Sequence, residues 1–232
     1  MDVEGCPVPE DLLYDLENDV WWRPAPDGTG TVGLTAPMAA FAGRFQSIQF
    51  RPVTGVVERG RSVATVESVR YTGAIRLPVD AEVVERNPSV VERPRLVNDA
   101  PYSQGWLVRI RPRDPRELGE RLRPASEARA VLAAQIRERH IRCYAATPDV
   151  ELYEIGIECS AVLAQLDAEL ARRSPGDVVL LVTDDPTSPI EMVRWSDRSG
   201  HTVLDHRREG PLEHFLVRRE AEPHPRRPGA SR

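Results

Sequence analysis

Short runs of alternating hydrophobic and polar residues fill the first half of the chain, from Trp21 to about Ile110. Gly, Pro and Asp separate these runs, and a period of two is typical of β-strands that bury one face. The pattern predicts a short helix over 37–45 and strands over 20–23, 31–35, 47–50, 62–69, 77–84 and 106–110. Many short strands at regular spacing indicate a sandwich or a small barrel.

The period becomes helical after Asp114, and two helices broken at Pro124 are predicted to close this β-rich domain. From Tyr153 onward the predicted order is strand, helix, strand, helix, strand, strand, and Ile155 and Ile157 fit alternate positions of the first strand. The stretch 178–183 is apolar at every position, which predicts a central strand covered by helices. The stretch 188–191 reads as a capping box that starts the second helix.

Composition narrows the class of protein. The chain has 31 basic and 36 acidic residues and a formal net charge of -5, which argues against a dedicated nucleic-acid-binding protein. Its apolar runs are too short to span a bilayer, and its N-terminal segment is acidic where a signal peptide is basic. A cytoplasmic location without membrane association is therefore expected.

Three cysteines, Cys6, Cys143 and Cys159, make an odd number without zinc spacing. Free thiols in a reducing compartment are therefore expected, with no metal site. Asp184 and Asp185 follow a buried strand in a Thr-Asp-Asp-Pro sequence, and they are predicted to make turn hydrogen bonds rather than to bind a metal.

All 31 basic residues are arginines, because the sequence contains no lysine. The arginine guanidinium stays protonated, so it forms neither an amide with a carboxylic cofactor nor a Schiff base. Attachment of lipoate or biotin to a lysine amine is therefore excluded for this chain, and no cofactor is expected.

Cys159 is the candidate catalytic residue, because it lies where a predicted strand ends and a helix begins. Backbone N–H groups and the helix dipole at such a position favour the thiolate, as a nucleophilic or sulfur-carrying cysteine requires. The alternative is that Cys159 is a small buried hydrophobic residue, as most lone cysteines are. Cys143 could be a second relay thiol, the resolving partner of Cys159, or a packed side chain.

Four motifs between about Leu13 and Ile141 resemble the glycine-cleavage H protein and the lipoate-binding H-like proteins of sulfur metabolism: TVGLT (31–35), VERGRSVATVESV (57–69), AEVVERN (81–87) and LVNDAPYSQGWLVRIRP (96–112). The resemblance implies a lipoyl-type barrel-sandwich hybrid with C-terminal helices. In the family, Glu-Ser-x precedes the lysine that takes lipoate, whereas here Arg70 occupies the lipoyl-lysine position. The resemblance thus implies a docking domain without a lipoyl arm, in which Arg70 could bind a carboxylate or sulfonate.

Residues from about Tyr153 to Arg219 resemble the TusA/SirA-like sulfur carriers, through the motifs GIEC (156–159), PGD (175–177), TDDP (183–186), SGH (199–201) and FLVRR (215–219). The resemblance implies an α/β two-layer sandwich of order βαβαββ, whose cysteine carries a persulfide. That family has Cys-Pro-x-Pro, and here Ser160 replaces the first proline. Ser160 would begin the helix and donate a hydrogen bond to the thiolate.

Together these patterns predict four segments: an H-like domain over 13–142, a linker over 143–151, a TusA-like domain over 152–220 and a disordered tail over 221–232. The leading hypothesis is a sulfur-relay protein, a sulfurtransferase-like carrier rather than a turnover enzyme. It would pass persulfide sulfur on Cys159 from a donor to an acceptor protein. The alternative is a non-catalytic adaptor of a lipoate-dependent or glycine-cleavage-type complex. A true lipoyl carrier is the least favoured hypothesis, because lysine is absent.

Overall fold

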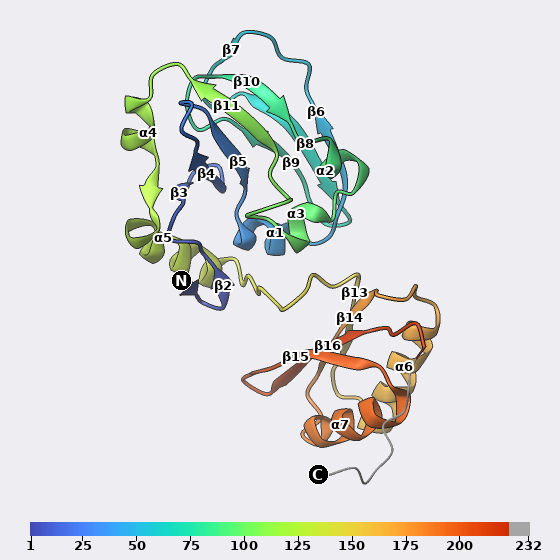
Figure 1. Ribbon diagram of the computed structural model, residues 1–232. Coiled ribbons are helices and arrows are strands. Elements are labelled where there is room, and N and C mark those ends of the chain that lie inside the picture. The colour runs from blue at the N-terminus through green and yellow to red at the C-terminus, as the bar shows by residue number, and fades with distance from the viewer. Residues whose placement is uncertain (223–232) are drawn as a thin grey trace, which may run out of the picture. The chain divides into compact units, whose positions relative to one another are not determined.

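The computed structural model describes residues 1–222, which form two compact units, Met1–Cys143 and the chain from Tyr144 onward (Figure 1). The part of the predicted disordered tail at 223–232 lies outside the described residues. Within the described chain, no helix is both long enough and apolar enough to cross a membrane.

The first unit is β-rich, as its alternating pattern predicts. Its seven-stranded sheet has the order β12-β3-β4-β5-β11-β10-β7, with bounds β3 (Leu13–Asp15), β4 (Val20–Pro24), β5 (Gly30–Leu34), β7 (Val56–Val57), β10 (Ala81–Arg86), β11 (Val108–Pro112) and β12 (Arg123–Pro124). A second sheet has the order β6-β8-β9, with bounds β6 (Phe45–Phe50), β8 (Ser62–Ser68) and β9 (Thr72–Arg76). The sequence pattern missed β9, which contains a glycine and only five residues.

One hydrophobic core joins these two sheets. Trp22 and Val32 from the larger sheet belong to the same buried cluster as Ile48, Val66 and Ile75 from the smaller one. The alternation is not strict, since β4 buries Val20, Trp21 and Trp22 in succession. Val20 and Trp22 face this core, and Trp21 on the opposite face joins a second buried cluster.

Five helices complete the first unit: α1 (Ala36–Ala42), α2 (Pro88–Glu92), α3 (Leu96–Asp99), α4 (Arg116–Arg121) and α5 (Ala125–Glu138). The last two are the helices predicted after Asp114. Thr35 caps α1 by accepting a hydrogen bond from the backbone N–H of Met38, as N-cap threonines commonly do.

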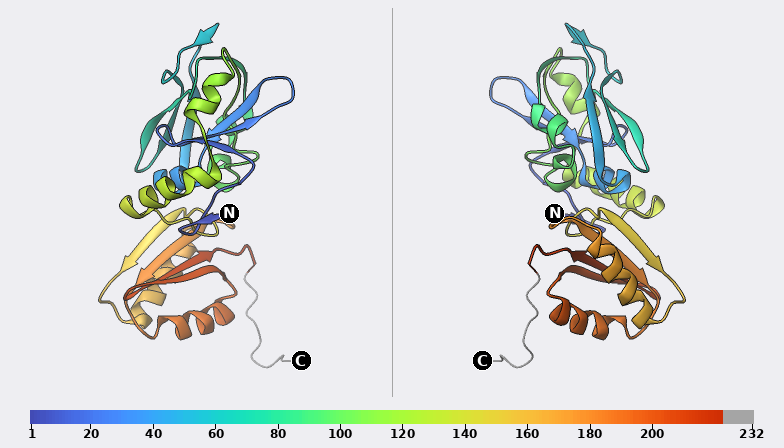
Figure 2. Two further views of the ribbon diagram at one scale, coloured as in Figure 1. Left: turned by 90° about the vertical axis from the view of Figure 1, so that its left-hand side faces the viewer. Right: turned by 90° about the vertical axis from the view of Figure 1, so that its right-hand side faces the viewer.

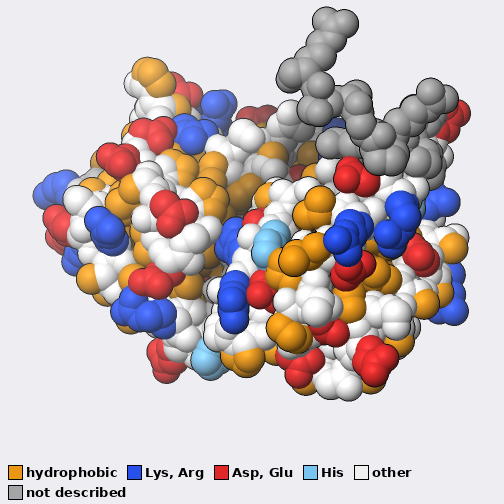
Figure 3. Space-filling view, turned by 90° about the horizontal axis from the view of Figure 1, so that it is seen from below, with side chains coloured by type: hydrophobic (Ala, Val, Ile, Leu, Met, Phe, Trp, Pro, Cys, Tyr) orange, Lys and Arg blue, Asp and Glu red, His pale blue; other side chains and the backbone are white. Residues whose placement is uncertain are grey.

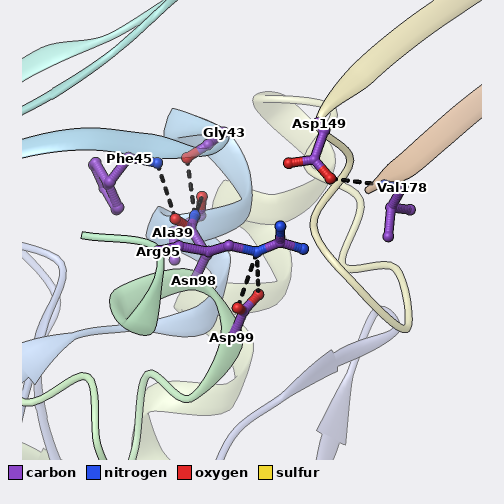
Figure 4. A network of polar contacts seen from close by, with 8 residues as sticks. All are labelled: Ala39, Gly43, Phe45, Arg95, Asn98, Asp99, Asp149 and Val178. Carbon is purple, nitrogen blue, oxygen red and sulfur yellow. Dashed lines mark hydrogen bonds and ion pairs between the residues drawn. The ribbon is translucent and has the colours of Figure 1, made fainter. Parts of the chain in front are cut away.

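The side chain of Asn98 in α3 fixes the end of α1 (Figure 4). Its Oδ1 accepts a hydrogen bond from the backbone N–H of Phe45 at 2.9 Å. Its Nδ2 donates to the carbonyl oxygens of Ala39 at 3.2 Å and Gly43 at 2.9 Å. Asn98 thereby adds donors at the end of the helix, where the last carbonyl groups lack a full set of partners within the helix. The same helix holds an ion pair between Arg95 and Asp99, with Nε 3.0 Å from Oδ2.

The N-terminal hairpin of β1 (Asp2–Val3) and β2 (Cys6–Pro7) lies near α5 (Figures 1 and 2). A second buried cluster forms there from the hairpin, Trp21 and the inner face of α5. A disulfide between Cys6 and Cys143 closes this cluster, with their Cα atoms 5.0 Å apart. The expectation of free thiols is therefore wrong for these two residues, because chain folding brings together cysteines 137 positions apart.

The second unit has the order β13 (Val150–Glu154), α6 (Cys159–Ala171), β14 (Val178–Thr183), α7 (Ser188–Ser199), β15 (Thr202–Glu209) and β16 (Leu212–Arg218). Its sheet has the strand order β13-β14-β16-β15. The pair β13–β14 is parallel, with α6 in the crossover, and the other pairs are antiparallel. The first unit ends at Cys143 and β13 begins at Val150, so both ends of the predicted linker 143–151 lie in ordered structure.

All six residues of β14 are buried, as their apolar character predicts. The cover differs from the prediction, because α6 and α7 lie on one side of this sheet (Figure 2). The other face of β14 packs in part against Tyr144 and Ala146, from the segment that precedes β13. Burial of a strand on both faces therefore does not require helices on both faces.

Two further local predictions are wrong. Ile155 and Ile157 lie beyond the end of β13 in a turn and are 50% and 37% exposed. The predicted capping box is not formed either, since Thr187 is the N-cap of α7 without a side-chain bond and Ser188 lies inside the helix. Gly200 does end α7, with a φ of 75°, as predicted.

Candidate functional site

The first candidate site is the turn of the β8–β9 hairpin, which carries Arg70 at the predicted lipoyl-lysine position. The turn is organised by the hydroxyl of Ser68, which accepts hydrogen bonds from the backbone N–H groups of Arg70 at 3.3 Å and Tyr71 at 3.0 Å. The same hydroxyl donates to the carbonyl oxygen of Ala42 at 2.6 Å. The hairpin turn is thereby fixed to the end of α1.

The Arg70 side chain turns back onto that end of α1. Its Nη2 donates to the carbonyl oxygen of Ala40 at 3.0 Å. The guanidinium lies over Gly43, where a Cβ would be 2.8 Å from Nε of Arg70. A cation at the C-terminal end of a helix is favourable, because the last carbonyl groups there carry partial negative charge. Arg70 therefore closes the hairpin against α1.

Aromatic and charged side chains extend this contact. The Tyr71 ring meets the Phe41 ring edge-on, with their centroids 6.1 Å apart. The Arg139 guanidinium lies 5.7 Å from the centroid of Phe41, at cation–π distance. Its Nη1 also lies 3.3 Å from Oδ2 of Asp19. Burial raises the pKa of Asp19, and the opposing effect of Arg139 is smaller.

The second candidate site surrounds Cys159, the first residue of α6. Its backbone N–H donates to Oδ2 of Asp185 at 2.9 Å. The preceding turn is held by Asp184, whose Oδ1 accepts from the backbone N–H of Gly156 at 2.7 Å. Asp185 Oδ1 also accepts from the backbone N–H of Thr187 at 2.7 Å, two residues further on. This last bond is the Asx-type turn bond that the sequence predicts.

The environment of the Cys159 thiol favours the protonated form, so the expectation of a stabilised thiolate is wrong. The residue is 8% exposed. Its pKa is raised, first by burial and then by the negative charge of Asp185, with Glu191 adding to the effect. Only the hydrogen bond with the Thr187 side chain acts in the opposite direction. The thiol pKa is therefore raised by burial first and by the two carboxylates second, although Cys159 begins a helix.

Ser160 lies inside α6 and is exposed rather than at the helix cap. The Thr187 hydroxyl donates to Oδ1 of Asp185 at 2.6 Å, and the first backbone N–H of the helix is bonded to Oδ2 of the same carboxylate. Cys143 is bonded to Cys6 and is not available as a relay or resolving thiol. Cys159 is the free cysteine.

The sequence missed Asp185 and Glu191 as neighbours of the thiol. Asp185 follows β14, which pairs in parallel with β13, so the register of adjacent parallel strands could have placed it near Cys159. Glu191 is one turn into α7 and carries no local signal. Among residues 1–222, no group of three or more His, Cys, Asp or Glu side chains has a geometry that could hold a metal ion.

Charged side chains of both signs are interspersed with hydrophobic ones on the molecular face in Figure 3. Many arginines of the described chain are paired with carboxylates, such as Arg59 with Glu17 and Arg207 with Asp205. Single pairs of this kind on the surface contribute little to stability. These ion pairs do reduce the positive electrostatic potential that the arginines would otherwise produce at the surface.

Comparison with known proteins identifies relatives of the first unit. The family model described as glycine cleavage H-protein matches residues 12–135. Glycine cleavage system H protein 5 of Aquifex aeolicus is 38% identical over 145 residues, which is 61% of this chain and 98% of that protein. H protein 3 of the same organism is 46% identical over 109 residues, which is 47% of this chain and 68% of the relative.

A solved structure, that of a glycine cleavage system H protein from Mycobacterium marinum, is 28% identical to this chain. The matched region covers 55% of this chain and 98% of the Mycobacterium marinum chain, with a TM-score of 0.46. The region that the family model matches lies wholly within the first unit.

Proposed function

The chain belongs to the glycine cleavage H-protein family, and from this premise we propose that it is a docking adaptor that has the H-protein surface but no lipoyl arm. Relatives of the first unit are named as components of the glycine cleavage system. The proposed partners are therefore proteins of a glycine-cleavage-type complex that recognise this surface. Lipoate plays no covalent part, because the chain has no lysine.

The observation that carries this proposal is the position of Arg70. In the family, the arm-bearing lysine must extend from the hairpin to reach its partners. Here the side chain at that position is an arginine that donates to the carbonyl oxygen of Ala40. The same hairpin keeps its anchor to α1 through Ser68. The proposal is thus that the β8–β9 hairpin keeps the shape of the lipoyl-bearing hairpin and carries no lipoyl group.

Sulfur transfer at Cys159 remains a prediction, and it is the weaker one. A thiol attacks a sulfur donor as the thiolate and needs access to it. The Cys159 thiol is 8% exposed, and burial together with Asp185 raises its pKa. The likeness of the second unit to the TusA/SirA-like carriers, including the Cys159-Ser160 start of α6, also remains a proposal.

Intact-mass spectrometry with a lipoate-attaching enzyme tests the lost arm. The wild-type chain is expected to stay unmodified, and Arg70→Lys is expected to gain the mass of one lipoyl group, because the rest of the hairpin is retained. Arg76→Lys is the matched control, since Arg76 also lies exposed on this hairpin and donates to the carbonyl oxygen of Gly60. A modified control, or an unmodified Arg70→Lys, contradicts the assignment of this position.

Competition binding tests docking directly. Unmodified wild-type chain is expected to compete with a lipoylated H protein for a glycine-cleavage partner enzyme, and Cys159→Ser should compete equally well. Absence of competition contradicts the adaptor function. A sulfur adduct on Cys159 after incubation with a persulfide donor, lost in Cys159→Ser, would instead support the sulfur-relay hypothesis.

A further inference from the structure

A pocket of about 280 Å³ lies in the second unit between α7 and the strands β15 and β16. Its wall includes Met192 and Val193 from α7 and Val203 from β15. Its volume is at the small end of the range for small-molecule sites, about 300–1,000 Å³. Neither Arg70 nor Cys159 lines this pocket, so it is separate from both candidate sites described above.

Two contacts hold the imidazole ring of His206 at this pocket: a hydrogen bond at one edge of the ring and an aromatic ring against one face. Its Nε2 lies 2.7 Å from Oε2 of Glu213, a carboxylate that is 5% exposed. The imidazole ring stacks on the Phe215 ring, with centroids 4.4 Å apart and an angle of 7° between the planes. His206 and Phe215 are directly opposed in the antiparallel pair of β15 and β16, which accounts for the stacking.

The bond to Glu213 determines which nitrogen of His206 can meet a ligand. A carboxylate that is ionised only accepts hydrogen bonds, and the tautomer that bonds to it carries the proton on Nε2. In the neutral ring the lone pair then lies on Nδ1. Since Glu213 occupies Nε2 and Phe215 occupies one face, the Nδ1 edge and the second face remain for a ligand. In its neutral form His206 therefore offers a hydrogen-bond acceptor that is oriented by Glu213, itself ion-paired with Arg208.

His201, on the same pocket, is held as a neutral ring. Its Nδ1 accepts a hydrogen bond from the backbone N–H of Glu220 at 3.2 Å. Burial and the nearby positive charge of Arg219 lower its pKa. The hydroxyls of Ser196 and Thr202 donate within the protein, to the carbonyl oxygen of His201 and to Glu220. These groups leave the pocket poor in positive charge.

The charges at the pocket favour an uncharged ligand with a donor. The charged side chain in its lining is Asp197, and no arginine is among the lining residues. A carboxylate or phosphate ligand would therefore meet the negative charge of Asp197, since Glu213 is paired with Arg208 at 3.4 Å. A ligand hydroxyl, in contrast, can donate to Nδ1 of His206, while its ring packs on Met192 and Val193.

We infer that this pocket binds a small, uncharged aromatic molecule that carries a hydroxyl group, with the hydroxyl donated to Nδ1 of His206. The ring lies against the apolar wall from α7. This inference is independent of the proposed docking function, because it concerns the second unit alone. It adds a small-molecule site to a chain whose relatives are named for the glycine cleavage system.

The test is an NMR titration of the full chain with phenol, toluene and benzoate, followed through backbone amide shifts. Phenol is expected to cause saturable shifts in α7 and β15 with a Kd of about 1 mM, as suits its size. Toluene lacks the hydroxyl, and its affinity should be at least about fivefold lower. Benzoate should bind more weakly than phenol. Unsaturable phenol shifts, or tighter binding of toluene or benzoate, overturn the inference.

Two variants locate the site. His206→Phe keeps a flat ring against Phe215 but removes Nδ1, so its affinity for phenol should match its affinity for toluene. Val193→Asp changes the wall at a side chain that is 63% exposed, so folding is not at risk, and it should weaken phenol binding at least about fivefold. Val131→Asp, on exposed α5 in the first unit, is the matched control and should leave binding unchanged. Wild-type affinity in Val193→Asp overturns the inference.

Discussion

At the scale of single residues, Gly43 determines where the Arg70 side chain lies. Its φ of 73° is in the region that favours glycine, and its backbone N–H bonds to the carbonyl oxygens of Ala39 and Ala40. The absence of a Cβ leaves room for the Arg70 guanidinium, which a Cβ would approach to 2.8 Å. One glycine therefore serves both the end of α1 and the closed hairpin.

Gly43→Ala is expected to lower the free energy of unfolding by about 1–3 kcal/mol, because alanine is strained at this φ. It should also displace Arg70 from the carbonyl oxygen of Ala40. Chemical denaturation measures the first effect, and NMR of the Arg70 Nε–H measures the second. Gly119→Ala is the control, since its Cβ would meet nothing within 4 Å, and in a helix it should stabilise by up to about 1 kcal/mol. Equal stability of wild type and Gly43→Ala contradicts this account.

The thiol of Cys159 is controlled by its carboxylate neighbours, and this yields a second prediction. Because Asp185 raises its pKa, Asp185→Asn should lower that pKa and so increase the thiolate fraction at any pH below it. Alkylation of Cys159 near pH 8 should become severalfold faster. Asn keeps one of the two acceptor oxygens that bond the backbone N–H groups of Cys159 and Thr187, so one of these two bonds should persist. Asp184→Asn is the control, because Asp184 bonds Gly156 instead, and a rate increase there as large as in Asp185→Asn contradicts the prediction.

At the scale of secondary-structure elements, the Asn-Asp-x-Pro-Tyr motif of the family has a structural role in this chain. Asn98 joins α3 to α1 and β6 through three hydrogen bonds. Tyr102 accepts from the backbone N–H of Ala36 and donates to the carbonyl oxygen of Pro7. The motif therefore fixes α1, on which the Arg70 hairpin rests.

Asn98→Ala is expected to destabilise the chain by about 2–4 kcal/mol, because it removes three hydrogen bonds, to the N–H of Phe45 and to the carbonyl oxygens of Ala39 and Gly43. Urea denaturation measures the loss. Asn18→Ala is the comparison, since the Asn18 side chain bonds only Asp15, three residues away, among the described residues, and should cost about 1 kcal/mol or less. Similar losses in the two variants would show that Asn98 has no special role in joining the elements.

At the scale of the whole molecule, the Cys6–Cys143 disulfide joins the N-terminal hairpin to the end of the first unit. The enclosed loop of the chain is long, so the bond removes much entropy from the unfolded state. Reduction, or the pair of changes Cys6→Ser and Cys143→Ser, should lower the free energy of unfolding by about 3–5 kcal/mol. Thermal unfolding with and without reductant measures this.

Thiol counting provides the control for the disulfide. Alkylation of the denatured, unreduced chain should modify Cys159 alone, and prior reduction should expose Cys6 and Cys143 as well. Because Cys159 is not part of the disulfide, reductant should lower the unfolding temperature of Cys159→Ser by as much as that of the wild type. Three modified cysteines without reduction would show that the disulfide is not formed.

Features that depend on local pattern and on residue identity could be predicted without the structure. The β-rich character of the first unit follows from its alternating pattern, and the absence of lysine excludes an amide-linked arm through chemistry alone. The H-protein motifs, and Arg70 after Glu67-Ser68-Val69, were identified from the amino-acid sequence. The helix start at Cys159 was also predicted, to within one residue.

Only the tertiary structure decided what surrounds each of these residues, because electrostatics and bonding depend on distance in space rather than along the chain. The Cys6–Cys143 bond spans 137 positions, and the carboxylate that raises the pKa of Cys159 comes from 26 residues away. The Arg70 side chain likewise reaches Ala40, 30 residues earlier. Contacts of this kind arise from strand pairing and helix packing, which no local pattern specifies.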